Sequence, residues 1–238
     1  MSLIRNHGVT APAGFKASAV DGVVAVLVNE GPDLAAAGVF SSAERPSADE
    51  LWTKQVLTSG RLRAVLLHAG SPSAALSDDF ALTHHAAESL ATTLSGWGTS
   101  TGAGEVGVCA TGGNTLPALL EVVAEAVYEL AGGITGGFAA ARVAAGPQGA
   151  PTQAVMQHDD GWTVGGLSSS AGSVHVLITD AVADAAVLLG ALNSERPAGT
   201  TALLLASGAS EIRCHPADLS QAVAEVRKDL RAQTPEAV

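Results

Sequence analysis

The stretch Asp159 to Asp180, DDGWTVGGLSSSAGSVHVLITD, decides how the rest of the chain can fold. It opens on a polar turn, continues through Trp162-Thr163-Val164 and reaches the glycine pair Gly165-Gly166. A loop of small residues, Leu167 to Ser173, leads into an apolar, β-branched run from Val174 to Thr179. β-Branched residues favour strands, and glycines let a backbone or a ligand approach closely. The stretch therefore predicts two strands joined through a Gly/Ser turn that can carry functional residues.

The composition is acidic, sparsely charged and poor in aromatic residues. Of the 238 residues, 47% are hydrophobic but only 3% are aromatic, so the core must be built from Ala, Val and Leu. Charged residues make up 15%, against roughly 25% in an average soluble domain. A net charge of −11 argues against nucleic acid and anionic membrane surfaces, because both require basic patches. The low charge density favours much buried sheet or contacts between subunits.

No segment predicts export or membrane insertion. The N-terminus lacks the apolar run of a signal peptide, and no stretch reaches the ~18 apolar residues of a membrane span. Cys109 and Cys214 are the two cysteines, and we expect both to stay reduced. From these features we expect the protein to be cytoplasmic.

The pattern of apolar segments and turn residues predicts a mixture of strands and helices. Strands are expected at Val23–Val28, Ala35–Phe40, Leu62–Leu67, Val106–Ala110, Val174–Thr179 and Thr201–Ala206, with a hairpin formed by Gln153–Gln157 and Gly161–Val164. Helices are expected from Ser47 to about Leu57, from Ser77 or Asp78 to about Leu94, from Asn114 or Thr115 to about Leu130, from Val182 to Leu192 and from Asp218 to Gln233. Ser47 and Glu50 have the spacing of a capping box. Because strands and helices do not alternate strictly, the order favours a layered α+β fold.

Five motifs carry a resemblance to a known family. They are Val9–Phe15, Val108–Gly112, Gly161–Gly166, Val176–Asp180 and Leu203–Gly208. In the same order along the chain they resemble the ornithine acetyltransferase (glutamate N-acetyltransferase) family. The resemblance covers most of the chain and implies one α+β domain over residues 1–238, a layered α-β-β-α sandwich shortened at its C-terminus. Residues 1–145 would form its N-terminal part and residues 146–238 a truncated second part.

The chain departs from that family where the family carries its chemistry. In the family the Gly/Ser loop continues through an apolar insert that ends in the nucleophilic Thr, whereas here Ser173 joins the loop almost directly to the strand. Thr152 stands where the family has a Lys that helps to hold the substrate. Thr111 and Gly112 resemble the segment that supplies the oxyanion hole. The resemblance thus implies Thr111 and Gly112 as oxyanion-hole remnants and Thr152 and Ser173 as substrate-side positions, with no cofactor and no metal.

Other residue patterns have a functional and a structural interpretation. Thr111 and Gly112 can also form a plain strand-to-helix turn. A hydroxyl from the loop Ser168–Ser173 could replace the lost nucleophile, with His175 close in sequence, but a flexible Ser-rich linker is the favoured interpretation. His175 would share a face with Ser173 only through the alternation of a strand.

The remaining polar residues favour structural roles. His84 and Glu88 have the spacing of two metal ligands on a helix, but no third ligand is evident and a solvated helix face is favoured. Asp159-Asp160-Gly161 is typical of a hairpin turn. Cys109 lies in an apolar strand and is expected to be unreactive core.

Three hypotheses of function follow. The first is a degenerate homologue related to arginine biosynthesis that has lost covalent acetyl transfer. It would bind a small molecule such as an N-acetylated amino acid, as a homo-oligomer or paired with an active relative. The second is a working N-acetylornithine–glutamate acetyltransferase that uses a Ser of the Ser168–Ser173 loop. The third is a gene remnant without activity.

Overall fold

The strands form two sheets in a computed structural model that describes residues 2–3, 8–41, 46–69, 78–111, 119–130, 132–147, 149–170, 172–194 and 199–233. The six-stranded sheet has the order β1-β7-β8-β9-β10-β4, and the four-stranded sheet has the order β2-β3-β5-β6. The strands of the six-stranded sheet are β1 (Ser2–Leu3), β4 (Ala36–Val39), β7 (Thr152–Gln157), β8 (Thr163–Ser168), β9 (Val174–Thr179) and β10 (Thr201–Ala206). Those of the four-stranded sheet are β2 (Phe15–Val20), β3 (Val24–Asn29), β5 (Ala64–His68) and β6 (Val106–Ala110).

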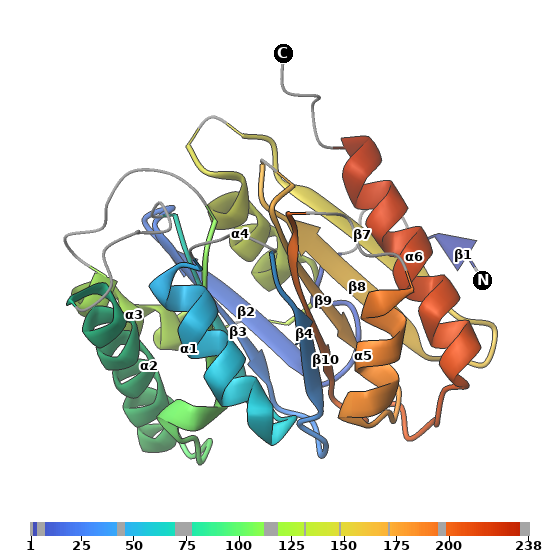
Figure 1. The fold of residues 1–238 in the computed structure, drawn as a ribbon, viewed down its shortest axis with the longest axis horizontal. Helices are drawn as coiled ribbons and strands as arrows, with labels where there is room; N and C mark the ends of the chain where they lie inside the picture. The colour runs from blue at the N-terminus through green and yellow to red at the C-terminus, as the bar shows by residue number, and fades with distance from the viewer. Residues whose placement is uncertain are drawn as a thin grey trace.

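Helices cover the outer faces of both sheets (Figure 1). They are α1 (Ala48–Val56), α2 (Asp78–Gly96), α3 (Leu119–Tyr128), α4 (Gly133–Ala145), α5 (Ala185–Asn193) and α6 (Pro216–Gln233). The helices α5 and α6 pack on the six-stranded sheet, while α2 and α3 lie beside the four-stranded sheet. The helix α4 contacts strands of both sheets. The arrangement is an α+β fold, as the sequence pattern predicts, layered as α-β-β-α, as the family resemblance implies.

Two hydrophobic cores account for the layers. One lies between the sheets and joins inward-facing residues such as Val176 and Ile178 of β9 to the four-stranded sheet and its helices. The other lies between the six-stranded sheet and α5 and α6, and includes Leu177 of β9. Successive residues of β9 therefore point into different cores, as strand geometry requires.

The glycine pair of the opening stretch allows close packing on both faces of β8. A Cβ on Gly165 would lie 2.4 Å from the carbonyl oxygen of Val9, so the segment before β2 crosses directly over the strand. A Cβ on Gly166 would lie 2.6 Å from a methyl group of Leu177 and 2.8 Å from one of Val226 on α6. All three distances are below normal van der Waals contact, which explains why glycine is needed at each position.

Most of the predicted elements are present, and three were not anticipated, namely β1, β2 and α4. The strand β2 begins at Phe15, the last residue of the motif Val9–Phe15, and α4 occupies a segment after the helix that was expected to end at about Leu130. The start of α3, where Asn114 or Thr115 was expected as the cap, lies outside the described residues. Among the helices of the described ranges, none combines the length and apolarity needed to cross a bilayer.

Candidate functional site

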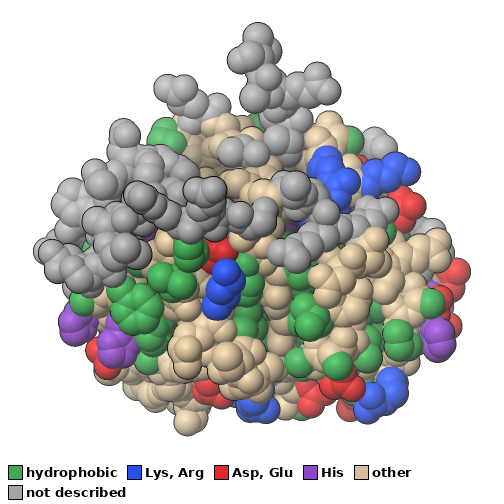
Figure 2. All heavy atoms as spheres, in the orientation of Figure 1, with side chains coloured by type: hydrophobic (Ala, Val, Ile, Leu, Met, Phe, Trp, Pro, Cys, Tyr) green, Lys and Arg blue, Asp and Glu red, His purple; other side chains and the backbone are tan. Residues whose placement is uncertain are grey.

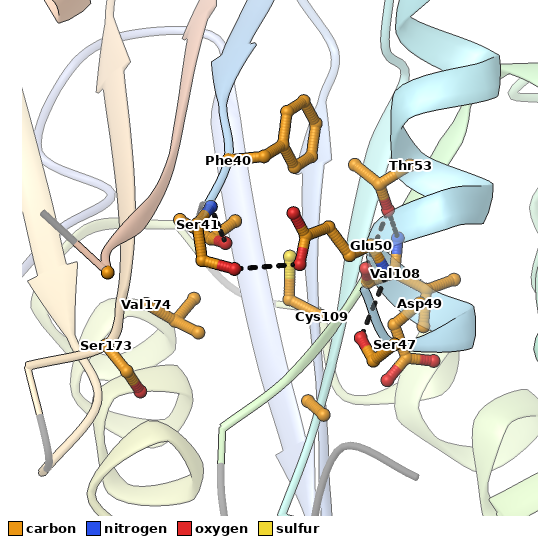
Figure 3. A pocket seen from close by; sticks show the side chains of 13 residues that line it. Phe40, Ser41, Ser47, Asp49, Glu50, Thr53, Val108, Cys109, Ser173 and Val174 are labelled. Carbon is orange, nitrogen blue, oxygen red and sulfur yellow. Dashed lines mark hydrogen bonds between the residues drawn. The ribbon is translucent and has the colours of Figure 1, made fainter. Parts of the chain in front are cut away.

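A cavity of about 130 Å³ opens between the two sheets at the C-terminal end of β6 (Figure 3). It collects residues from five elements that are far apart in sequence: the end of β4, the first turns of α1, the end of β6, the start of β9 and the start of β10. The lining consists of Phe40, Ser41, Ser47, Asp49, Glu50, Thr53, Val108, Cys109, Ala110, Ser173, Val174, Gly199 and Thr201. This lining has an anionic and hydroxyl-rich side and an apolar side.

The helix α1 brings its acidic first turn to the cavity because it is fastened along the edge strand β6. Thr53 Oγ1 donates to the carbonyl of Val108 at 2.7 Å and accepts from its N–H at 2.9 Å. Trp52 Nε1 donates to the carbonyl of Val106 at 2.9 Å. The side chains of α1 thus satisfy polar groups of β6 that no further strand pairs.

Only half of the predicted capping box forms at the start of α1. Ser47 is the N-cap, and its hydroxyl accepts from the N–H of Glu50. The Glu50 carboxylate is engaged elsewhere: Oε2 accepts from the Ser41 hydroxyl at 3.0 Å, and Oε1 lies 3.2 Å from Lys54 Nζ. Glu50 therefore belongs to the cavity, although the sequence marked it only as a capping residue.

Asp49 forms a second buried polar cluster next to Glu50. Its Oδ1 accepts from the Thr83 hydroxyl at 2.9 Å, and its Oδ2 lies 3.1 Å from Nε2 of His68 at the end of β5. Asp49 is 7% exposed and also lines the cavity. The cluster holds the first turn of α1 against the carboxyl ends of β5 and β6, which run parallel.

Cys109 lines the cavity but remains a protonated thiol. Burial raises the pKa of Cys109 well above its ordinary value, and the nearby carboxylates of Asp49 and Glu50 raise it further. Because the thiolate is the nucleophilic form of cysteine, this residue is unreactive at neutral pH. The expectation of an inert cysteine is consistent with this environment.

The loop between β8 and β9 is a hydrogen-bonded turn, so the favoured interpretation of a flexible Ser-rich linker was wrong. Ser168 and Ser169 are fully buried. Ser169 donates its N–H to the carbonyl of Val174 at 2.9 Å and accepts from the Val174 N–H through its hydroxyl at 3.1 Å. Gly172 closes the turn by donating to the carbonyl of Ser169 at 2.8 Å. The buried hydroxyls thus serve the backbone of the turn.

Ser173 is the predicted site residue that the structure places at the cavity. Its side chain is exposed, and its hydroxyl lies 3.3 Å from that of Ser169. His175 does not lie beside Ser173 as a base for its hydroxyl. Val174 lines the cavity, whereas His175 is buried on the opposite face of β9, near Arg227 and Arg231 of α6. Burial, and secondarily these two guanidinium groups, lower the pKa of His175 to about 4, so it is a weak base.

The other predicted site residues do not line the cavity. Thr111 follows β6 and is buried, with its hydroxyl donating to the carbonyl of His68 at 3.1 Å and its N–H donating to the same oxygen at 2.9 Å. Thr152 begins β7, and its hydroxyl donates to the carbonyl of Ser168 at 3.0 Å. Gly112 lies outside the described residues. In the described part of the site, Thr111 and Thr152 therefore serve the backbone.

The histidines of α2 and the Asp159–Gly161 segment have the structural roles that the sequence favoured. His84 and His85 lie on the surface of α2, both within 3.4 Å of the Glu88 carboxylate. Asp159, Asp160 and Gly161 form the turn between β7 and β8, with Gly161 in the left-handed region at a φ of 102°. Within the described ranges, no three His, Cys, Asp or Glu side chains are grouped to hold a metal ion.

The fold and the cavity define a class: a layered α-β-β-α protein with a small polar site between its two sheets. No family model matches the chain. The arginine biosynthesis bifunctional protein ArgJ of Mycobacterium tuberculosis is 45% identical over 265 residues, covering 97% of this chain and 66% of the relative. ArgJ of Streptomyces coelicolor is 34% identical, covering 94% of this chain and 66% of the relative. The chain thus spans about two thirds of the length of these relatives.

Solved structures agree with the sequence matches. The crystal structure of ornithine acetyltransferase complexed with ornithine, from M. tuberculosis, is 46% identical with a TM-score of 0.67, covering 71% of this chain and 94% of that chain. ArgJ of Bacillus halodurans matches with a TM-score of 0.58 at 18% identity, over 71% of this chain and 92% of that chain, which shows the fold alone. The chain belongs to the ornithine acetyltransferase (ArgJ) family.

Proposed function

We propose that this chain is an ornithine acetyltransferase-like protein related to arginine biosynthesis that binds a small amino-acid-type ligand without covalent acetyl transfer. Family membership supports the biosynthetic role, since the relatives are named for arginine biosynthesis. The relative of known structure is complexed with ornithine. The cavity beside Ser173 supports a binding site for a small ligand here.

The short turn between β8 and β9 is the main support for the proposed loss of acetyl transfer. The family resemblance calls for a nucleophilic Thr at the end of an insert between these strands. The alignment with the relatives runs over 265 residues, longer than the 238 of this chain, so the relatives have segments that it lacks. Here five residues, 169–173, separate β8 from β9, and the described residues Ser169 and Gly172 close the turn with hydrogen bonds. A turn this short leaves no room for such an insert.

The groups around the cavity also offer little support for a nucleophile. Acyl transfer needs a nucleophile, a base that accepts its proton and donors for the oxyanion. His175 faces away from the cavity, and the hydroxyl of Thr111 is directed to a backbone carbonyl. Binding without turnover is the behaviour that this arrangement favours.

Ligand-induced stabilisation tests the binding role. A ligand at 100 times its dissociation constant should stabilise the folded chain by about 2.7 kcal/mol, or roughly 5 to 10 °C in Tm for a domain of this size. We expect such a rise with N-acetylornithine or ornithine. Ser173→Phe should abolish it by filling the mouth of the cavity, whereas Ser170→Phe, on the same turn but away from the lining, should retain it. No rise with any N-acetylated or free amino acid would contradict the binding role.

One observation favours a second candidate, an active N-acetylornithine–glutamate acetyltransferase. Ser173 is exposed at the cavity, so its hydroxyl can reach a bound ligand. Under this alternative, transfer of acetyl from N-acetylornithine to glutamate would be measurable and Ser173→Ala would remove it. Under our proposal, neither the parent nor the variant shows transfer above the background rate.

Association with a second subunit is part of the proposal. The sparse charge of the chain favours contacts between subunits, and on the face shown in Figure 2 the Lys and Arg side chains are scattered among other types. We expect a homo-oligomer or a complex with an active relative. Light scattering coupled to size-exclusion chromatography, alone and with such a relative, checks this; a monomer in both cases would contradict it.

A further inference from the structure

The charged side chains in the described lining of the cavity are carboxylates. Two carboxylates, Asp49 and Glu50, line it together with hydroxyl groups and one protonated thiol. Within the described lining there is no Lys, Arg or His side chain. Among the described lining residues, a ligand carboxylate would therefore meet no cationic side chain, whereas an ammonium group would meet a partner of opposite charge.

Glu50 is the carboxylate with capacity left to bind. It is 9% exposed, and its Oε1 is fully buried with no hydrogen-bond partner. Its Oε2 accepts one hydrogen bond, from Ser41. A carboxylate can accept about four hydrogen bonds, so Glu50 uses a fraction of its capacity. Figure 3 shows its carboxylate directed across the cavity towards Ser41, beside Cys109.

Glu50 already forms an ion pair with an ammonium group, that of Lys54. Lys54 Nζ lies 3.2 Å from Glu50 Oε1, a contact that makes an ion pair but no hydrogen bond of good geometry. The Lys54 side chain is 43% exposed, and its ammonium also lies 5.1 Å from the ring centre of Phe40. Lys54 is therefore placed at the margin, where a ligand ammonium inside the cavity can compete with it.

The volume limits the ligand to a short chain. A cavity of about 130 Å³ is close to the roughly 150 Å³ of an engineered protein cavity that binds benzene. We propose that the cavity binds the ammonium group of a small aliphatic amine, with Glu50 as the residue that holds it. This inference rests on the proposed binding role of the cavity and names the end of the ligand that is recognised.

Matched four-carbon ligands test the inference by calorimetry on the full chain. 1,4-Diaminobutane should bind at least tenfold more tightly than 1,4-butanediol, which has the same length without charge, and butanedioate should not bind. Glu50→Gln should weaken the diamine at least tenfold. Lys54→Met should strengthen it severalfold, because it removes the competing ammonium. Glu225→Gln, a carboxylate of α6 outside the cavity, should leave the affinity unchanged, and the Tm of each variant without ligand checks its folding.

The outcomes separate this inference from the proposed function. Equal affinity for diamine and diol, or a folded Glu50→Gln variant that binds the diamine as tightly as the parent, would overturn the ammonium site. If N-acetylornithine still stabilises the parent and Ser173→Phe still abolishes that effect, the proposed function survives. If the diamine binds through Glu50 while no amino acid stabilises the chain, the ammonium site stands and the arginine-related role fails.

Discussion

Ser173 and His175 stand two residues apart at the start of β9 and lie in different environments. Ser173 is exposed at the cavity, while His175 is buried against α6. The alternation of a strand would put both on one face, but Ser173 precedes β9 and belongs to the turn. A serine–histidine pair is therefore suggested by the sequence and not formed in the fold.

The buried His175 should make stability fall with acidity. Burial and the guanidinium groups of Arg227 and Arg231 lower its pKa from 6.5 to about 4. The unfolded chain takes up this proton near pH 6.5, whereas the folded chain does so only near pH 4. Stability from His175 is thus complete above pH 6.5 and falls by about 3 kcal/mol on going down to pH 4. In urea unfolding between pH 7 and 4, the parent should lose about that much more stability than His175→Gln, and an equal loss in both proteins would contradict the prediction.

The helix α1 covers β6, the edge strand of the four-stranded sheet, and Thr53 bonds its backbone. Thr53→Val keeps the shape of the side chain but leaves the N–H and carbonyl of Val108 without their partner. Because buried unsatisfied polar groups are costly, we expect a loss of about 1–3 kcal/mol in the free energy of unfolding. Thr58→Val, which removes only an exposed hydrogen bond, should stay within about 0.5 kcal/mol of the parent. Similar losses for both variants in chemical denaturation would argue against the role of Thr53.

Gly166 in β8 is required by close packing, whereas Gly190 in α5 is not, and alanine substitutions can show the difference. Gly166→Ala places a Cβ against Leu177 and Val226 and should cost about 1–3 kcal/mol by overpacking. Gly190→Ala in α5 meets open space and should be neutral or stabilise by up to about 1 kcal/mol, because alanine favours helix. Thermal unfolding of the two variants should therefore shift Tm in different directions. A stabilising Gly166→Ala would refute the packing of α6 on β8.

The elements that the sequence predicted are those with strong local signals. The hairpin β7–β8 has a turn of Asp159-Asp160-Gly161, and α1 has the cap Ser47. The helix α4 was missed because Gly133, Gly136 and Gly137 weaken its propensity, and packing against both sheets stabilises it instead. A Cβ on Gly137 would lie 2.6 Å from the N–H nitrogen of Val9, so this glycine serves a contact far away in sequence. Such contacts have no local signature.

In the whole molecule, the packing of the two sheets and α1 against one another forms the site. Ser173 could be predicted through the family resemblance, because the lost insert points to the start of β9. Asp49 and Glu50 could not, because their place at the cavity depends on α1 packing along β6 from another part of the chain. Thr111 was expected as an oxyanion-hole remnant and Thr152 as a substrate-side position. Their hydroxyls donate to backbone carbonyls in the structure, and their roles towards a substrate stay predictions. The family relation identifies the scaffold, and the tertiary contacts identify the lining.

We propose that this family member binds a ligand without forming an acyl-enzyme. Intact-mass spectrometry of the purified chain, before and after incubation with N-acetylornithine, tests it most directly. We expect a single chain at the full mass in both samples. Two fragments that sum to the full mass, or an acetyl adduct lost in Ser173→Ala, would contradict the claim and establish covalent catalysis.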